Sequence, residues 1–299
     1  MAANPSSRCF RMLRSCHVNI MVNWLIKLAA LLACVVPPSL AAGGLVPEQR
    51  IELAYDVYLG GFFAGSVDLT TEQINARYLI ATTSRSHGLL DFLIELRRRN
   101  KSQGQFMDHQ ARPSRYVTTG VRAGEARSVE IEYGADGDVR FTTRPSAAED
   151  KREAVPPHHL RGTMDPLSAL YQAILRFGKG AGCMGRSKVF DGRRRYDFQF
   201  ETIDEGQTDG PFYSGLASIC RVRQIPIAGF SKQTWLPLLT RPKWTDIWLA
   251  KLRDNLPPLP VRLQADAGLG AMVAHLVAVG GRKQPPGSAQ LSNPEARPE

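Results

Sequence analysis

Apolar and polar residues alternate along most of the chain, beginning shortly after residue 50. Between Ile51 and Leu59 every odd position is apolar or aromatic, and the even positions are mostly polar. A period of two is typical of a strand with one buried face. Gly60-Gly61 follows, and a glycine pair between two alternating runs predicts a two-residue hairpin turn with positive φ at both positions.

The same pattern recurs to the end of the sequence and predicts a mostly β, antiparallel protein. Short strand-like runs separated by turn residues indicate hairpins, not parallel units with crossover helices. The nearly apolar run at 270–279 predicts a central strand that is covered on both faces. A curved sheet that forms an open barrel, a closed barrel or a sandwich fits this alternation equally well. The expected strands lie at 51–59, 63–69, 78–84, 102–107, 114–121, 128–133, 138–143, 189–198, 213–224, 245–252, 260–267 and 270–279.

Two segments predict helices that pack on this sheet. Residues 88–97 carry apolar side chains at helical spacing. The second helix is better marked, because Asp165 is a good N-cap, Pro166 suits the first helical position and Gly178 suits the end. Such a helix ordinarily packs its apolar stripe on a sheet, but the stripe is also our candidate contact for an apolar ligand. The candidate ligand-binding residues are Leu167, Leu170, Tyr171 and Ile174.

The first 41 residues have the pattern of a cleavable secretory signal. Basic residues precede a short apolar run, Leu28 to Val36, and Ser39-Leu40-Ala41 forms a small-residue cleavage site. The apolar run is far shorter than the roughly 20 residues that a membrane-spanning helix needs. Lipidation at Cys34 is the less favoured alternative. We therefore expect a periplasmic protein.

Export changes the interpretation of the charge and of the cysteines. The formal net charge is +10, and subtracting four basic signal residues leaves about +6. Because this mild excess accompanies no nucleic-acid motif, we expect a lipid or another envelope component as partner, with peripheral membrane association, and no nucleic acid.

Only Cys183 and Cys220 remain after cleavage, and an oxidising compartment predicts one disulfide between them. We expect one antiparallel β domain at 42–280 and a disordered tail at 281–299.

The decapeptide VFDGRRRYDF, residues 189–198, carries three consecutive arginines behind an Asp-Gly pair. Asp191-Gly192 predicts a type I′ hairpin turn, because Asp and Gly both tolerate positive φ. In the strand that follows, Arg193 and Arg195 share a face, where Asp197 can pair with Arg195. This face is either a solvated polar surface, which we favour, or a site for an anion or a partner. In the second case the binding residues are Arg193, Arg195 and Arg221.

Three motifs and a cysteine pair stand out together. They are the opening hairpin YDVYLGGFFAG, the helix start MDPLSAL at 164–170, the VFDGRRRYDF strand, and the cysteines at 183 and 220 that bracket this strand. Over residues 51–279 the chain resembles the bacterial periplasmic family called domain of unknown function 3108. The resemblance implies a secreted, antiparallel β protein, and it supplies no catalytic residues because none is established for the family.

The sequence offers no recognisable catalytic constellation. It has no G-x-S-x-G nucleophile motif, phosphate-binding loop or dinucleotide fingerprint. His158-His159 lacks the spacing and the third ligand of a zinc site. Glu130 and Glu132 share one strand face, which does not give the flanking geometry that glycoside hydrolysis needs. We therefore expect no enzyme activity, no metal and no cofactor.

Three hypotheses of function follow from the sequence. We expect a non-enzymatic periplasmic envelope protein whose curved sheet binds an apolar or lipid-like ligand along the second helix. The alternative is an interaction protein that binds peptidoglycan, lipopolysaccharide or an envelope protein through basic strand faces. A hydrolase of envelope polymers is the third, and it requires His158 or His159 beside two carboxylates. A fully packed interior would remove the ligand hypothesis and leave an adaptor role.

Overall fold

The computed structural model describes residues 49–88, 91–92, 95–107, 110–150, 152–230, 243–268 and 270–283. These residues all belong to one compact unit, Val46–Glu299. The predicted signal sequence at 1–41, with the alternative lipidation site Cys34, lies outside the described residues, as does most of the predicted tail. The sheet reaches Lys283, three residues into the predicted tail, because β14 (Arg282–Lys283) pairs with the preceding strand.

The fold is a single antiparallel sheet, as the alternating pattern predicts. The strands are β1 (Gln49–Leu59), β2 (Phe62–Ile74), β3 (Arg77–Ser86), β4 (Leu96–Met107), β5 (Gln110–Arg122), β6 (Glu125–Tyr133), β7 (Val139–Arg144), β8 (Gly185–Phe190), β9 (Arg195–Thr208), β10 (Gly215–Ala228), β11 (Trp244–Ala250), β12 (Leu259–Asp266), β13 (Ala271–Val279) and β14. Their order is β7-β6-β5-β4-β3-β2-β1-β13-β12-β11-β10-β9-β8, and β14 pairs with β13. Within the described residues no ladder joins β7 to β8, so the sheet is open.

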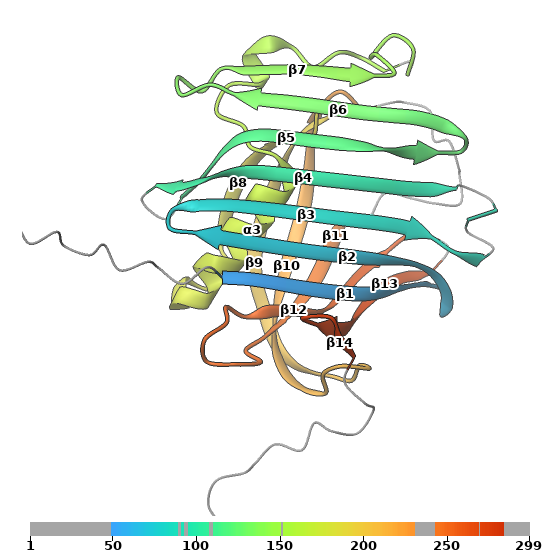
Figure 1. Cartoon of the computed structure of the whole chain (residues 1–299), viewed down its shortest axis with the longest axis vertical. Coiled ribbons are helices and arrows are strands. Elements are labelled where there is room, and N and C mark those ends of the chain that lie inside the picture. Colours follow the sequence, from blue (N-terminus) through green and yellow to red (C-terminus); the bar gives the residue numbers. More distant parts are fainter. Residues whose placement is uncertain are drawn as a thin grey trace, which may run out of the picture. The chain divides into compact units, whose positions relative to one another are not determined.

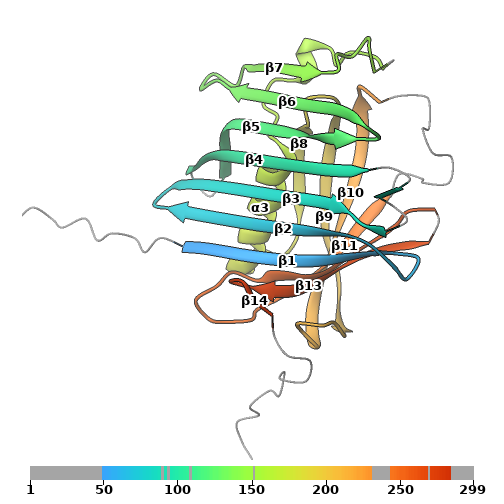
Figure 2. The ribbon, with the colours of Figure 1, turned by 45° about the vertical axis from the view of Figure 1, so that its right-hand side comes forward.

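The sheet curls around one helix, α3 (Pro166–Arg176). Figures 1 and 2 show β1–β7 in one layer and β8–β11 running across it, with α3 between the two. Leu170 and Ile174 pack against a buried cluster of the β9–β11 layer that contains Phe200. Tyr171 packs on the other layer, against Tyr78 of β3. The helix therefore fills the space that the curved sheet encloses.

A buried polar cluster holds the start of α3, and it confirms the predicted helix and its cap. Asp165 is fully buried, at 0 % exposure. Its Oδ1 accepts hydrogen bonds from the backbone N of Leu167 and of Ser168, both at 3.0 Å. Its Oδ2 accepts from the hydroxyls of Ser168 (2.7 Å) and Ser102 (2.8 Å). The hydroxyl of Tyr78 lies 2.7 Å from that of Ser168, so the cluster joins α3 to β3 and β4.

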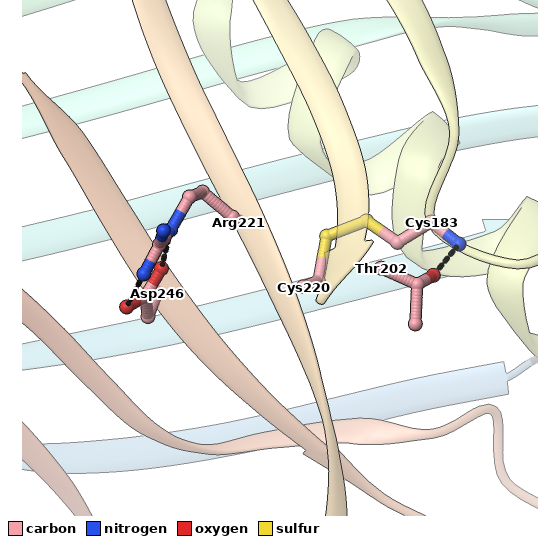
Figure 3. The surroundings of a disulfide bond; sticks show 5 residues. All are labelled: Cys183, Thr202, Cys220, Arg221 and Asp246. Atoms are coloured by element: carbon pink, nitrogen blue, oxygen red, sulfur yellow. Dashed lines mark hydrogen bonds and ion pairs between the residues drawn. A yellow bond between two sulfur atoms is a disulfide. The ribbon is translucent and has the colours of Figure 1, made fainter. Parts of the chain in front are cut away.

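Two further sequence predictions are confirmed. Gly60 and Gly61 have φ of 55° and 86°, as a two-residue turn between β1 and β2 requires. Cys183 and Cys220 form a disulfide with a Cα–Cα distance of 5.6 Å. Figure 3 shows the hydroxyl of Thr202 accepting a hydrogen bond (2.8 Å) from the backbone N of Cys183. The disulfide lies in the cluster that packs on α3, and it ties the segment after the helix to β10.

Two predicted elements differ from the structure. The helix expected at 88–97 extends too far, because Leu96 and Arg97 begin β4 and their ladder partners on β5 fix them as strand. Residues 89, 90, 93 and 94 of that prediction lie outside the described residues. The strand expected at 270–279 is central in the sheet as predicted, but only Leu276 and Ala278 of β13 are buried. One face of β13 therefore stays partly open, and the prediction of cover on both faces is wrong.

The two end strands of the sheet are covered to different degrees. Met164 lies along β8, where its backbone N donates to Lys188 O (2.9 Å) and its carbonyl accepts from Phe190 N (3.0 Å). This short parallel bridge brings together two of the sequence motifs, the MDP helix start and the arginine-rich strand. The outer edge of β7 pairs with no other strand in the described part of the chain.

Candidate functional site

The turn between β8 and β9 differs from the predicted type I′ hairpin. Only Gly192 has a positive φ, 84°, and Asp191 does not. Asp191 Oδ1 instead accepts hydrogen bonds from the backbone N of Arg193 (2.9 Å) and of Arg194 (2.7 Å). This side-chain turn competes with the hairpin that the Asp-Gly pair favours, and here it prevails. Because β9 begins at Arg195, the first two arginines lie in the turn and not on a strand face.

Arg193 holds this turn against the end of β7. Its guanidinium pairs with Asp150 and donates to the carbonyl oxygens of Arg144 (2.6 Å) and Pro145 (3.1 Å). The side chain is 15 % exposed. Arg193 therefore links the two ends of the sheet through side-chain contacts, and its donors are engaged within the protein.

Arg195 and Arg221 are engaged within the protein as well. Arg195 donates to Asp197 Oδ1 (2.6 Å) and to His159 O (3.1 Å). The predicted Arg195–Asp197 pair is confirmed, but the predicted solvated face is wrong here, because Arg195 is only 5 % exposed. Arg221 makes two hydrogen bonds to Asp246, at 2.7 Å and 2.8 Å (Figure 3). The three arginines that the sequence nominated thus have separate internal partners and do not form one site.

A different set of arginines meets on the inward face of β4–β6, the face that carries the buried residues and α3. Ser102 of β4 bonds to the cap of α3, and Arg98, four residues earlier, shares its face because side chains alternate along a strand. By the same alternation, Arg122 lies four residues after the buried Thr118 of β5 and is on this face. Arg127 lies two residues before the buried Val129 of β6 and is on it as well. A fourth comes from the β8–β9 turn. We define the arginine cluster as Arg98, Arg122, Arg127 and Arg194.

The ladders place members of the cluster side by side. Gly120 of β5 pairs with Arg98 on β4 and with Arg127 on β6. Because Gly120 has no side chain, nothing separates the two arginines along this row. Arg122 lies two residues further along the same face of β5.

The arginines of the cluster lie close enough to repel one another. Burial lowers the pKa of Arg122, and the charges of Arg127, Arg98 and Arg194 lower it further. Arg98 makes no ion pair with any residue that the structure describes. The cluster therefore holds positive charge that this part of the protein leaves unneutralised.

Two other members of the cluster, Arg127 and Arg194, have carboxylate partners. Arg127 pairs with Asp150 and with Glu125, each at 3.0 Å. Arg194 pairs with Asp191 at 2.9 Å. The Nε of Arg127 is nevertheless buried without a hydrogen-bond partner. Since a buried donor without an acceptor is costly, the cluster has an unmet need for an acceptor as well as for negative charge.

Hydrogen-bonded polar side chains separate the cluster from the apolar core. Asn100 donates from Nδ2 to Thr82 Oγ1 (2.8 Å) and accepts at Oδ1 from Thr118 Oγ1 (2.9 Å). These residues form the next row of β3, β4 and β5 on the inward face. Guanidinium groups bind phosphate and carboxylate through paired N–H donors. The arrangement suits the binding of an anionic group.

The residues nominated for an apolar ligand are part of the packed core. They are Leu167, Leu170, Tyr171 and Ile174, and each contacts buried side chains of the sheet. Two pockets on the described residues lie elsewhere. The larger, about 490 Å³, is lined by Tyr58, the β1–β2 turn, the β9–β10 turn and His275. The smaller, about 260 Å³, lies beside Trp244. The helix stripe is thus accounted for by packing.

The described residues contain few arrangements with catalytic geometry. No three His, Cys, Asp or Glu side chains among them gather as metal ligands would. His158 and His159 lie in a short turn, η1 (Pro157–His159), with their rings 4.2 Å apart. Ser66 Oγ lies 3.1 Å from Nε2 of His87, a contact that the sequence did not nominate. No described carboxylate bonds to the other ring nitrogen, so the orienting member of a triad is missing from this part of the chain. Across the described ranges, no helix is both long and apolar enough to span a bilayer.

Sequence reasoning missed Arg98, Arg122 and Arg127, although a signal for them was available. Each lies an even number of residues from a buried position in its strand, so parity assigns it to the inward face. The strands predicted at 102–107 and 114–121 did not reach Arg98 and Arg122, and the helix predicted at 88–97 included only Arg97 of the three arginines at 97–99. Longer strands would have placed all three correctly.

Comparison with known proteins identifies a family but no activity. Residues 54–277 match the family described as a protein of unknown function, DUF3108. No curated protein matches the chain. One similar solved structure is a β-barrel-like protein of domain of unknown function DUF1849 from Brucella abortus. It has 12% identity and a TM-score of 0.47, and the match covers 77% of this chain and 96% of that chain.

Proposed function

We propose that this chain, which belongs to the DUF3108 family, is a non-enzymatic periplasmic protein that binds an anionic component of the cell envelope at the arginine cluster. The family description assigns no function, so the proposal rests on the residues of this chain. One observation carries it. Arginines from β4, β5, β6 and the β8–β9 turn lie close together on one face, and Arg98 has no counter-ion among the described residues.

The secretory pattern of residues 1–41 supports a location in the envelope. The disulfide between Cys183 and Cys220 supports it too, because such bonds persist in oxidising compartments. Phosphate and carboxylate groups of lipopolysaccharide and peptidoglycan are the anions that this location offers. A binding role is favoured over catalysis, because the buried carboxylate Asp165 is occupied in capping α3.

The hypothesis of an apolar or lipid-like ligand inside the sheet has weaker support. Its candidate residues on α3 contact both layers of the sheet, and a ligand there would have to displace the helix. Removing a packed helix would expose the buried apolar surface of both layers, at a cost of about 25 cal/mol for each Å². The proposal made here corresponds to the second hypothesis from the sequence, binding through a basic face, with the arginine cluster in place of Arg193, Arg195 and Arg221.

The test is pyrophosphate binding, measured by titration calorimetry on the purified protein at low ionic strength. The variant Arg98→Ala with Arg122→Ala removes two members of the cluster. Arg99→Ala is the matched control, because Arg99 is an exposed neighbour on the opposite face of β4. Each hydrogen bond to a charged group contributes about 1.5–3 kcal/mol, so we expect the double variant to bind at least tenfold more weakly. The control should bind like the unmodified protein.

Two results would contradict the proposal. The first is a lack of pyrophosphate binding by the unmodified protein at low salt. The second is equal weakening by Arg99→Ala, which would mean that net charge alone governs binding. Native mass spectrometry of the same proteins, purified from a periplasm, then shows whether an anionic envelope molecule copurifies and whether the double variant loses it.

A further inference from the structure

Large apolar side chains protrude from one end of the β1–β7 layer. β1 and β3 run in the same direction in the antiparallel sheet, so the turn after β1 and the connection after β3 leave from the same end. Met272 of β13 also lies there, because it pairs with Leu59 at the end of β1. We define the aromatic end by its exposed residues Phe62, Phe63, Phe92 and Met272.

The exposure of two of these rings is unusual. Phe92 is 87% exposed and Phe62 is 81% exposed, the two highest values among the large apolar side chains of the described ranges. Single exposed apolar residues are ordinary on protein surfaces, but a group of them marks an interaction site. Phe92 stands on the connection between β3 and β4, and Phe62 is the first residue of β2, directly after the Gly60-Gly61 turn. They therefore project from the end of the sheet.

Other aromatic rings support the base of these tips. Phe63 stacks on His87 with ring centroids 5.4 Å apart, and Tyr58 meets Phe63 edge-on at 5.8 Å. The backbone N of His87 donates to Ala64 O at 2.8 Å, which ties the β3–β4 connection to β2. The tips thus stand on an ordered base that presents them together.

The same end of the sheet is rich in arginine. The last residues of β3 and β5 and the first of β4 and β6 lie here. The basic residues are Arg85, Arg97, Arg98, Arg99, Arg122 and Arg127, and the acidic ones are Asp68, Asp91, Glu95, Glu125 and Asp150, which pairs with Arg127. Neither Arg98 nor Arg99 has an ion pair among the described residues. The end therefore joins exposed rings to a positive excess.

We propose that the aromatic end docks on the surface of an anionic phospholipid bilayer, with Phe62 and Phe92 inserted among the headgroups and upper acyl chains. Aromatic rings are favoured at the boundary between headgroups and hydrocarbon, and basic residues beside them attract anionic lipid. Protruding tips need a deep matching pocket on a protein partner, whereas a bilayer deforms to accept them. This docking goes beyond the proposed function, because it depends on the rings of Phe62 and Phe92, although its basic residues include three members of the arginine cluster.

The test is flotation of the purified protein with vesicles of phosphatidylethanolamine and phosphatidylglycerol. Phe62→Ser with Phe92→Ser removes both tips. The control is Ile74→Ser, since Ile74 is 46% exposed at the opposite end of β2. We expect the double variant to lose roughly tenfold in vesicle binding for each ring, from the apolar area that no longer inserts. We expect Ile74→Ser to bind normally, and vesicles of phosphatidylcholine alone to bind the unmodified protein more weakly.

A second measurement locates the contact. In Phe62→Trp the new indole should show a blue-shifted emission on adding the anionic vesicles and should be quenched by brominated lipids, while the indole of Ile74→Trp should not respond. Undiminished vesicle binding by the double serine variant, or an unresponsive Phe62→Trp, would overturn the proposal. So would loss of a copurifying protein from the double variant without any loss of vesicle binding. Pyrophosphate binding by the double serine variant should stay normal, which separates this proposal from the anion site.

Discussion

Replacing Asp165 tests whether a buried carboxylate holds α3 in the sheet. Asp165 accepts four hydrogen bonds, two from backbone N–H groups of the helix and two from the hydroxyls of Ser102 and Ser168. Asp165→Ala removes the N-cap, which costs about 1 kcal/mol, and leaves buried hydroxyls without their acceptor, at about 1–3 kcal/mol for each. We expect the free energy of unfolding to fall by about 4 kcal/mol. In Asp165→Asn, Oδ1 still caps the helix, so we expect about half that loss.

The measurement is denaturant unfolding followed by circular dichroism at neutral pH, with Ser102→Ala as a third variant. Ser102→Ala removes only one hydrogen bond to the carboxylate and should cost about 1.5 kcal/mol. A loss below about 1 kcal/mol for Asp165→Ala would refute the reasoning, since a cap alone can account for that amount. Equal losses for Asp165→Ala and Asp165→Asn would also refute it, because the Oδ1 bonds would then contribute nothing.

The dependence on pH gives an independent check. Burial raises the pKa of Asp165 above its ordinary value of 3.8, although the four donated hydrogen bonds act in the opposite direction. The native state then binds the proton more tightly than the unfolded chain, so its stability falls as pH rises. The stability of the unmodified protein relative to Asp165→Asn should be highest below pH 3.8 and should decline until the pH passes the folded-state pKa. A relative stability that rises over this interval would show that the hydrogen bonds outweigh burial.

Three further perturbations test other parts of the fold. Arg193→Ala should lower the free energy of unfolding in denaturant by about 2 kcal/mol, because the carbonyl oxygens at the end of β7 lose the guanidinium that donates to them. Asp150 keeps other arginine partners, which limits the loss. An unchanged unfolding midpoint would show that these contacts do not link the ends of the sheet. Cys183→Ser with Cys220→Ser should cost about 4 kcal/mol on the chain-entropy estimate, with no added effect of reductant on the variant; a reductant effect on that variant would contradict the assignment. Leu170→Ala should cost about 2 kcal/mol and leave pyrophosphate binding unchanged, as expected of core packing, and a selective loss of binding would instead indicate a ligand contact.

The strands and the helix were predictable because their signals are local. Ile51, Leu53 and Tyr55 alternate with polar residues and are buried as the period of two requires. Asp165 and Pro166 begin α3 as a cap and a first helical residue should. These preferences act between neighbours in the sequence, so they could be recognised without knowledge of the fold. Whether the sheet would close could not be recognised in the same way, because closure depends on strands far apart in the chain.

The partners of the arginines could not be predicted, because they come from distant segments. Arg193 meets Asp150, 43 residues away, and Arg195 meets the carbonyl of His159, 36 residues away. The local pattern showed only that Arg195 and Asp197 share a strand face, and that pair did form. The arginine cluster required both the parity of three strands and their order in the sheet. Only the parity of the strands was available from the sequence.

The difference between the two end strands has a consequence for self-association. Sheets grow edge to edge when each molecule offers two unpaired strands, because every addition leaves a new edge for the next. Here Met164 occupies backbone groups at Lys188 and Phe190 of β8, while β7 keeps its outer edge. Two copies can join β7 to β7, but the resulting pair has no second open edge of the same kind. Pairing of two copies through β7 would therefore stop at a two-fold dimer and would not continue into a fibre.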